Sequence, residues 1–362
     1  MGSLNKRRLQ ALVMLLALWQ TGAQASAYVD VLDLPARLSA LAVRSPMLDV
    51  ANAGPRLVAV GQRGHILYSD DAGKQWSQAS VPVSSDLNAV YFSSREQGWA
   101  VGNDGVILHS SDAGVTWKKQ LDGREIGALL VKHYSSLASA DPANEQWPLL
   151  VAEGQRLVEE GADKPLLDVW FANDKVGYVV GVFNLILRTE DGGQSWTPFQ
   201  DRTDNPQNFH LNAINSTGDA LYIAGEQGLL LKWDSSQQRF AALQTPYQGS
   251  FFGVVGKPGE VVVYGLRGNV LRSTDGGLSW TPLESGLQVS ITAAAVDAQG
   301  HYRFFTQAGH MLLAKDDSVR LQWVAQQSPS PVAGATAVGE GALVVVGSRG
   351  ARTLLEEQEP EQ

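Results

Sequence analysis

Residues 178–196 read YVVGVFNLILRTEDGGQSW, and three other segments align with them without a gap. These segments are VAVGQRGHILYSDDAGKQW at 58–76, WAVGNDGVILHSSDAGVTW at 99–117 and VVYGLRGNVLRSTDGGLSW at 262–280. Three weaker copies, at 222–233, 304–318 and 344–355, keep the first half of the pattern. The chain is therefore built from internal repeats, and their period determines the architecture.

The first residue of the glycine turn recurs at positions 61, 102, 181, 225, 265, 306 and 347, which are about 40 residues apart except for one gap of 79. Each unit predicts four short strands, as at 87–92, 98–102, 106–110 and 116–120. Four-stranded antiparallel units with two apolar faces stack radially, because each unit covers its neighbours. The sequence predicts an all-β fold, a seven-bladed β-propeller.

The gap of 79 residues contains an insertion at 123–164, between blades 2 and 3. Segments 125–139 and 144–160 have helical apolar spacing and predict a helical hairpin. A degenerate eighth blade is the competing interpretation, because 79 is nearly two periods.

The last blade has no room for a fourth strand after Leu355 except an acidic tail. We expect an N-terminal strand at 28–35 to close this blade and so remove an exposed sheet edge.

The N-terminus predicts a signal peptide at 1–27, with basic Lys6 to Arg8, an apolar run from Leu9 to Trp19 and small residues before the cleavage point. Cleavage after Ala25 or Ala27 leaves a propeller of residues 28–362, which we expect to be a soluble, monomeric periplasmic protein. The net charge of −9 argues against nucleic acid as a partner, and the absence of cysteine excludes disulfides and thiol chemistry.

The four full repeats contain the box [S/T]-x-D-x-G-x-x-W, to which we assign a structural role. In a tight turn the aspartate accepts backbone hydrogen bonds, glycine takes the positive φ, and the tryptophan packs between blades. The boxes comprise Ser69, Asp71, Gly73 and Trp76; Ser110, Asp112, Gly114 and Trp117; Thr189, Asp191, Gly193 and Trp196; and Ser273, Asp275, Gly277 and Trp280.

Signatures of catalysis are sparse. The chain has no H-E-x-x-H, G-x-S-x-G or phosphate-binding glycine motif, and its histidines lack metal-ligand spacing. We therefore expect no catalytic residue, no metal and no cofactor. Asp49 and Asp168 occupy predicted inner strands, where they are either a glycosidase carboxylate pair or a solvated or hydrogen-bonded pair.

The variable positions of the glycine turns predict a cationic arc across blades 5, 6, 7 and 1. Its members are Arg63, His65, Arg267, His310 and Arg349. Arginine binds carboxylates through a two-pronged fork, so the arc is a candidate site for an acidic partner or anion. Alternatively, these are the ordinary charges of exposed hairpin tips. Phe183, Leu185 and Leu229 form a candidate apolar counterpart.

The pattern G-x-x-G-x-[I/V]-L-x-[S/T]-x-D-G-G-x-[S/T]-W, best matched at 181–196 and 265–280, resembles the photosystem II stability/assembly factor family of Asp-box (bacterial neuraminidase repeat) propellers. The resemblance implies a non-catalytic chaperone on the exported side of a membrane, whose arginine-rich face contacts a membrane-protein segment. Arg188 and Arg272, which precede two boxes, are further candidates for that face.

We therefore expect a non-enzymatic assembly factor or scaffold for an envelope membrane-protein complex. The helical insertion departs from the compact photosynthetic pattern and favours a client other than a photosystem, such as a transporter. The alternatives are a secreted sialidase-like glycosidase, which lacks the expected R-I-P motif here, and a propeller that binds an anionic ligand.

Overall fold

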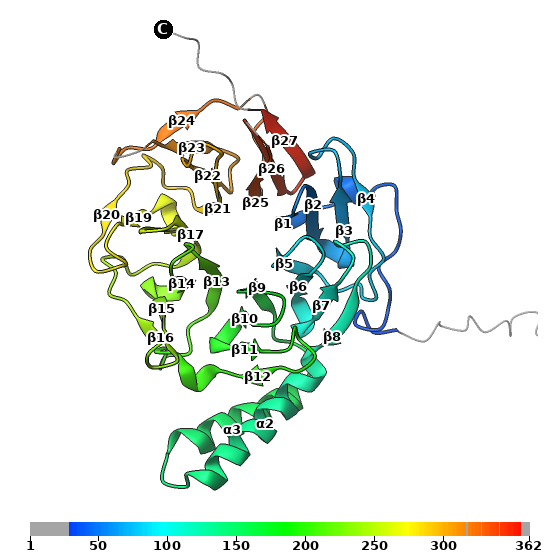
Figure 1. The fold of residues 1–362 in the computed structure, drawn as a ribbon, viewed down its shortest axis with the longest axis vertical. Helices are drawn as coiled ribbons and strands as arrows, with labels where there is room; N and C mark the ends of the chain where they lie inside the picture. Colours follow the sequence, from blue (N-terminus) through cyan, green and yellow to red (C-terminus); the bar gives the residue numbers. More distant parts are fainter. Residues whose placement is uncertain (1–28, 316–317, 327, 340, 356–362) are drawn as a thin grey trace, which may run out of the picture. The chain divides into compact units, whose positions relative to one another are not determined.

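The computed structural model describes residues 29–315, 318–326, 328–339 and 341–355, so the predicted signal peptide lies outside the described residues. From Val31 onward the chain forms seven antiparallel sheets arranged around a central axis (Figure 1). The predicted seven-bladed propeller is confirmed, and the eight-bladed interpretation is wrong because the inserted segment forms helices.

The first three blades flank the insertion in sequence. Blade 1 contains β1 (Met47–Ala53), β2 (Arg56–Gly61), β3 (Ile66–Ser69) and β4 (Ser77–Gln78); blade 2 contains β5 (Leu87–Phe92), β6 (Gly98–Gly102), β7 (Ile107–Ser110) and β8 (Lys118–Leu121); blade 3 contains β9 (Leu166–Phe171), β10 (Gly177–Gly181), β11 (Ile186–Thr189) and β12 (Thr197–Pro198).

The remaining four blades follow without interruption. Blade 4 contains β13 (Leu211–Ser216), β14 (Leu221–Gly225), β15 (Leu230–Asp234) and β16 (Arg239–Ala242); blade 5 contains β17 (Phe251–Lys257), β18 (Glu260–Gly265), β19 (Val270–Ser273) and β20 (Thr281–Pro282); blade 6 contains β21 (Ile291–Val296), β22 (Tyr302–Thr306), β23 (Met311–Ala314) and β24 (Gln322–Val324); blade 7 contains β25 (Val332–Ala337), β26 (Ala342–Gly347) and β27 (Gly350–Leu355).

The four Asp boxes have the same geometry, and their structural role follows from it. The Ser or Thr hydroxyl donates to the aspartate at 2.7–2.9 Å and accepts from the box glycine N–H at 2.8–2.9 Å. The tryptophans pack as predicted: Trp117 and Trp196 are buried, whereas Trp76 and Trp280 are half-buried against their clusters.

The inner strands are tied to one another around the axis by side chains. Each inner strand has a register shift after its first residue, as between Met47 and Asp49. In blade 2 the shifted residue, Asn88, donates to the carbonyl of Leu166 in blade 3 at 2.9 Å. Asn212 makes the equivalent bond to Phe251 at 2.8 Å. These bonds satisfy backbone groups that an inner sheet edge would otherwise leave unpaired.

Asp49 and Asp168 belong to the same set of bridges. Asp49 accepts from its neighbour Val50 at 2.8 Å and from Val90 of blade 2 at 2.9 Å. Asp168 accepts from Val169 and from Ile214 of blade 4, both at 2.8 Å. The hydrogen-bonded alternative for this pair therefore describes the structure, since each carboxylate joins two inner strands.

The insertion is the predicted helical hairpin, made of α2 (Gly123–Ala140) and α3 (Gln146–Glu160). Asp122 caps α2 by accepting from the N–H of Arg124 at 3.1 Å. Ile126, Leu130 and Tyr134 belong to the apolar cluster that also holds residues of blades 2 and 3. The hairpin, which projects below the blades in Figure 1, therefore shares their core.

The N-terminal segment does not close the last blade, so this prediction is wrong for its described part. Residues 31–35 form no strand, and the sheet of blade 7 has three strands. Leu32 is 1% exposed in the cluster of blades 1 and 2, and the backbone of Val31 accepts from Ser84 at 2.8 Å. Burial of this leucine beside blade 1 holds the segment away from blade 7.

The ring closes instead by packing of blade 7 directly on blade 1. Val344 and Val346 share a cluster with Met47 and Leu57. Asn52 of β1 donates to the hydroxyl of Thr336 in β25 at 2.9 Å. The short helix η1 (Ala42–Arg44) contacts β27.

Replacement of the box aspartate should destabilise the fold. Asp191→Ala removes an acceptor that serves Thr189, the N–H of Ser195 and the hydroxyl of Ser195. We expect a loss of about 1–3 kcal/mol of unfolding free energy, measured by chemical denaturation. The matched control is Glu190→Ala, whose exposed ion pair with Arg188 should contribute about 0–1 kcal/mol. Equal losses for the two variants would contradict the structural role of the box.

The inner-strand carboxyl groups of Asp49 and Asp168 predict pH-dependent stability. Burial raises the pKa of Asp49 to about 6, and burial together with the charge of Asp49 raises the pKa of Asp168 to about 8. The folded protein thus binds these protons more tightly than the unfolded chain. The contribution of these two groups to stability should be complete below their ordinary pKa of 3.8 and be lost as the pH rises through their folded pKa values of about 6 and 8.

Thermal melts between mildly acidic and mildly alkaline pH test this prediction. Asp168→Asn should flatten the decline in melting temperature, whatever its effect on absolute stability. Asp141→Asn, an exposed residue at the end of α2, is the control and should keep the wild-type slope. An unchanged slope in Asp168→Asn would rule out this source of pH dependence.

Candidate functional site

The turns between second and third strands all emerge at one end of the propeller, here called the turn face. Because the strands are antiparallel, the Asp boxes lie at the opposite end of the four blades that contain them. In five blades the third residue of this turn is left-handed, with φ between 52° and 58°; these residues are Arg63, Asp104, Phe183, Gln227 and Arg267. Identical backbone geometry places Arg63 and Arg267 at equivalent positions of blades 1 and 5.

Arg349 lies on the same face in a different turn. Gly347 pairs directly with Gly350, so Ser348 and Arg349 form a two-residue hairpin that is one residue shorter than the other turns. Arg63, Arg267 and Arg349 are all exposed. Among the described residues, none of the three has an ion-pair partner; Arg349 donates a 3.4 Å hydrogen bond to Ser328.

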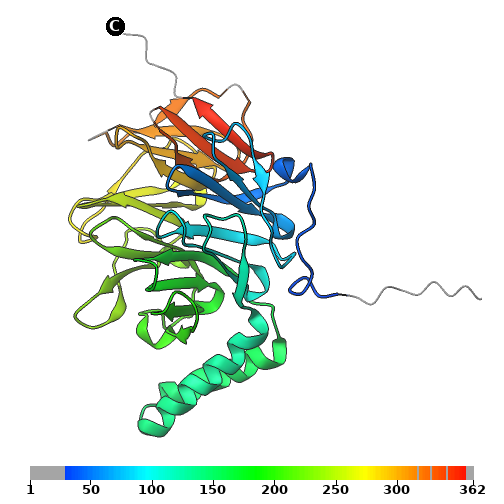
Figure 2. The same ribbon diagram turned by 45° about the vertical axis from the view of Figure 1, so that its right-hand side comes forward.

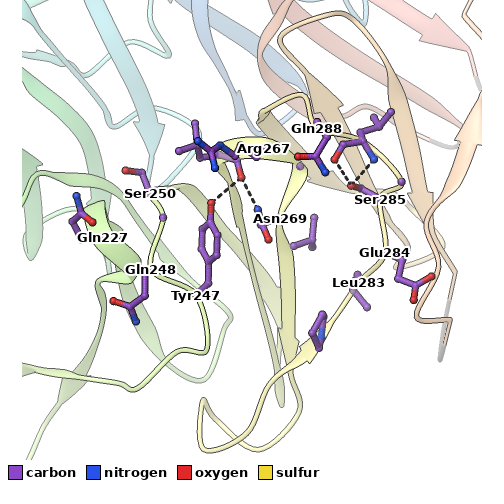
Figure 3. Close-up of a pocket in the computed structure, with 17 residues that line it drawn as sticks. Gln227, Tyr247, Gln248, Ser250, Arg267, Asn269, Leu283, Glu284, Ser285 and Gln288 are labelled. Carbon is purple, nitrogen blue, oxygen red and sulfur yellow. Dashed lines mark hydrogen bonds between the residues drawn. The ribbon is translucent and has the colours of Figure 1, made fainter.

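A polar cleft opens beside Arg267, between the turns of blades 4 and 5 and the loop that follows β20 (Figure 3). Its volume is about 910 Å³. Tyr247 and Asn269 both donate to the carbonyl of Leu266, at 3.0 and 2.9 Å, and so fix the wall beside Arg267. The polar side chains that line the cleft include Gln227, Gln248, Ser250, Ser285 and Gln288.

This cleft suits an extended chain that carries a carboxylate. Glutamine side chains both donate and accept hydrogen bonds, as peptide groups do. The Arg267 guanidinium can bind a carboxylate with two parallel hydrogen bonds. Sequence reasoning found Arg267 but missed Tyr247, Gln248 and Gln288, because they lie in the variable connections between blades, where the repeat gives no signal.

The two histidines of the predicted arc are withdrawn from the surface. His65 is 7% exposed, and burial together with the charge of Arg63 lowers its pKa. His310 is half-buried, and its ring lies 4.5 Å from that of Trp323. The lowered pKa favours the neutral form of His65, so this side chain contributes less positive charge to the arc than the exposed arginines do.

Arg188 and Arg272 do not join the arginines of the turn face. Both lie near the box ends of their strands and pair with acids: Arg188 with Glu190 at 2.8 Å, and Arg272 with Glu260 at 4.0 Å. The Arg188 guanidinium also lies over the rings of Tyr178 and Phe199. Placing these two arginines on the arginine-bearing face was therefore wrong, because the strand carries them to its other end.

The proposed apolar counterpart is reduced to one residue. Phe183 is 51% exposed, whereas Leu185 is buried and Leu229 is partly buried in the core. The ring of Phe183 packs edge-on against His210, 4.6 Å away. Acidic side chains, Asp104 and Glu226, occupy the turns of blades 2 and 4. The turn face is therefore electrostatically divided, with its arginines on blades 5, 7 and 1.

Two further cavities lie elsewhere. One, of about 790 Å³, lies near the box ends of blades 4 and 5 and is lined by Asp219, Lys232 and Asp275. The other, of about 840 Å³, lies between α3 and blade 4. Within the described ranges, no group of three or more His, Asp or Glu residues is placed to hold a metal ion. No helix in the part of the chain that the structure describes is long and apolar enough to cross a membrane.

Two curated relatives share sequence with parts of the chain. The photosystem II assembly lipoprotein Ycf48 of Synechococcus sp. (strain CC9902) is 30% identical over 133 residues, which cover 36% of this chain and 38% of that protein. The Ycf48 of Synechocystis sp. is 27% identical over 100 residues, or 28% of each chain. The matched stretches thus span less than two fifths of the length of either relative.

Solved structures match the fold over most of its length. YCF48 bound to D1 peptide has a TM-score of 0.63 and 15% identity, covering 91% of this chain and 100% of that one. YCF48 from Cyanidioschyzon merolae also has a TM-score of 0.63, with 15% identity, covering 89% and 98% of the two chains. The WD40 propeller domain of Doa1 has a TM-score of 0.61 and 11% identity, covering 91% and 97%.

The family described as photosynthesis system II assembly factor YCF48 matches residues 33–128 and 151–248. The interval between the two ranges falls within the helical hairpin, so the match covers propeller sequence on both sides of it. These matched residues, on a seven-bladed propeller with four Asp boxes, show that the chain belongs to the YCF48 assembly-factor family.

Proposed function

We propose that this protein is a non-enzymatic assembly factor or scaffold that binds an acidic segment of a membrane protein on its turn face. The observation that carries the proposal is the position of Arg267, which is exposed at a polar cleft with no ion-pair partner among the described residues. An unpaired guanidinium at the mouth of a cleft is available to a partner's carboxylate.

The surrounding charges favour an extended acidic partner. Arg267, Arg349 and Arg63 occupy blades 5, 7 and 1, which follow one another around the ring with blade 6 between the first two. A segment bound in the cleft beside Arg267 can therefore continue toward further arginines on the same face. The net charge of −9 would repel an acidic segment elsewhere, so the arginines also select the face at which it binds.

The comparisons support this choice of partner class. A propeller of the same fold has been solved with a bound peptide, D1. That structure does not identify the client of the present protein, because the two chains are only 15% identical and the similarity shows the fold alone. We propose a client in the envelope, with the protein acting in the periplasm after cleavage of its signal peptide; the basic, apolar and small-residue segments of residues 1–27 support that location.

Charge reversal tests the proposal. The triple variant Arg63→Glu, Arg267→Glu and Arg349→Glu should abolish recovery of the client when the tagged protein is purified from gently solubilised envelope and its partners are identified by mass spectrometry. Arg267→Glu alone should weaken binding of the recovered segment, as a synthetic peptide, by about tenfold or more. Binding to the wild type should also fall as salt is added.

Arg95→Glu is the matched control, because this exposed arginine lies in the connection between β5 and β6, at the box end of blade 2 and away from the turn face. Both it and the triple variant should melt within a few degrees of the wild type, since surface substitutions change stability by about 0.5 kcal/mol or less. A folded triple variant that keeps its partner would refute the arginine-face proposal. Recovery of no partner, together with binding of a small anion at Arg267, would support the anionic-ligand alternative.

A further inference from the structure

The segment Val31–Pro46, here called the strap, crosses the edge of the turn face and contains no strand; its one regular element is the short helix η1. Figure 2 shows it in dark blue, outside the blades. Hydrogen bonds hold it at several points: the N–H of Ala36 donates to the carbonyl of Val81 at 3.0 Å, and the N–H of Ser39 donates to the side chain of Gln78 at 2.9 Å. Asp33 binds Arg124 at 2.7 Å, which lowers the pKa of Asp33 to about 2. The strap is thus tethered along its whole course.

The strap presents large apolar side chains to solvent despite these tethers. Leu34, Leu38 and Leu41 are 44%, 70% and 67% exposed. Leu32 and Ala42, by contrast, are 1% exposed and fasten the strap to the core. Hydrogen bonds and the two buried residues already hold this segment, so packing does not explain three outward leucines within eight residues.

Arginines surround these leucines. Arg37 and Arg44 belong to the strap and are exposed, and residues 34–46 contain no acidic side chain. The strap also touches two turns of the turn face. A Cβ on Gly64 would lie 3.2 Å from the Cβ of Ala36, and one on Gly350 would lie 3.3 Å from the Cα of Arg44.

Those two contacts bring the turn-tip arginines into the same surface, because Arg63 precedes Gly64 and Arg349 precedes Gly350. The strap therefore spans from one turn-tip arginine to the other, with Leu38 and Leu41 between the two contacts. We define the strap patch as Leu34, Arg37, Leu38, Leu41 and Arg44, flanked by Arg63 and Arg349.

We propose that the strap patch binds the surface of an anionic phospholipid bilayer, with its leucines in the interface and its arginines against the lipid phosphates. Apolar side chains ringed by basic ones are the composition that partitions into anionic membrane interfaces. The leucines project from the strap and line none of the three cavities described above, which suits a broad interface rather than a peptide groove.

Charge complementarity selects the lipid. A protein of net charge −9 is repelled by an anionic bilayer, so approach is favourable only through a local basic surface. The strap patch gathers four exposed arginines on one edge of the molecule. This contact shares Arg63 and Arg349 with the proposed client-binding face but does not use the Arg267 cleft, and it would hold the turn face beside a membrane-protein partner.

The absence of cysteine from the chain allows one site at a time to be labelled. Leu38→Cys, carrying an environment-sensitive fluorophore, is mixed with vesicles of phosphatidylcholine, with and without phosphatidylglycerol. We expect a blue shift and an increase in emission with the anionic vesicles. Leu278→Cys is the matched control: it is 85% exposed in the box of blade 5, at the opposite end from the turn face, and should not respond.

Sedimentation with the same vesicles measures affinity. Arg37→Gln combined with Arg44→Gln should reduce the partition coefficient by about 30-fold, from the typical strength of two basic residues at an anionic surface. Leu34→Ser, Leu38→Ser and Leu41→Ser together should also release the protein, whereas Leu149→Ser, on the hairpin, should not. All variants share residues 1–28, so differences among them report on the strap patch.

Three results would overturn the proposal: no response at position 38, an equal response at position 278, or a response that grows with protein concentration without vesicles. The last result would make a second copy of the chain the occupant. Arg267→Glu separates this inference from the proposed function, because it should lose the client peptide while keeping its affinity for vesicles.

Discussion

Each blade of this propeller is a sheet with two apolar faces, and neither face can be left in water. The second strands show this most clearly, because β6 and β10 are buried along their entire length. A single blade therefore has no stable existence, and the fold depends on each sheet being covered on both sides. Every other feature is arranged around this requirement: bridges between inner strands, box tryptophans between blades, and direct packing of the last blade on the first.

No strand from the N-terminal segment completes blade 7 in the described part of the chain. Side-chain contacts between blades 7 and 1 close the ring instead. Val344 and Val346 of β26 pack against β1 and β2, and Asn52 donates a hydrogen bond to Thr336 across the junction. This releases the N-terminal segment from the sheets. The path of the N-terminal segment is set by Leu32, which packs into the cluster of blades 1 and 2. Asp33 then forms an ion pair with Arg124 at the start of the hairpin. The asymmetry of an otherwise repetitive molecule begins with these contacts.

The sequence was sufficient wherever a repeat or a local period carried the information. The strands of blade 2, the Asp boxes and both helices lie within a few residues of their predicted positions, because turn chemistry and apolar spacing are local. The wrong predictions concern contacts and positions that local sequence does not determine. Closure by residues 28–35 depended on which apolar cluster would bury Leu32, and the grouping of Arg188 with Arg63 ignored which end of the strand carries each side chain. The walls of the Arg267 cleft lie in blade connections, where no repeat constrains the residues, and so they gave no signal.

The shared core of the hairpin has a consequence for how this chain can be rearranged. Tyr134 is fully buried, donates to Gln200 at 2.9 Å and stacks on Trp147, while Gly105 of the blade 2 turn lies too close to Gly123 to accept a side chain. Excising residues 123–164 would expose apolar side chains of blades 2 and 3 that the hairpin now covers. A compact homologue could not receive the hairpin as a graft unless matching substitutions in blades 2 and 3 came with it. Its loss or gain is therefore expected as a coordinated change across both blades.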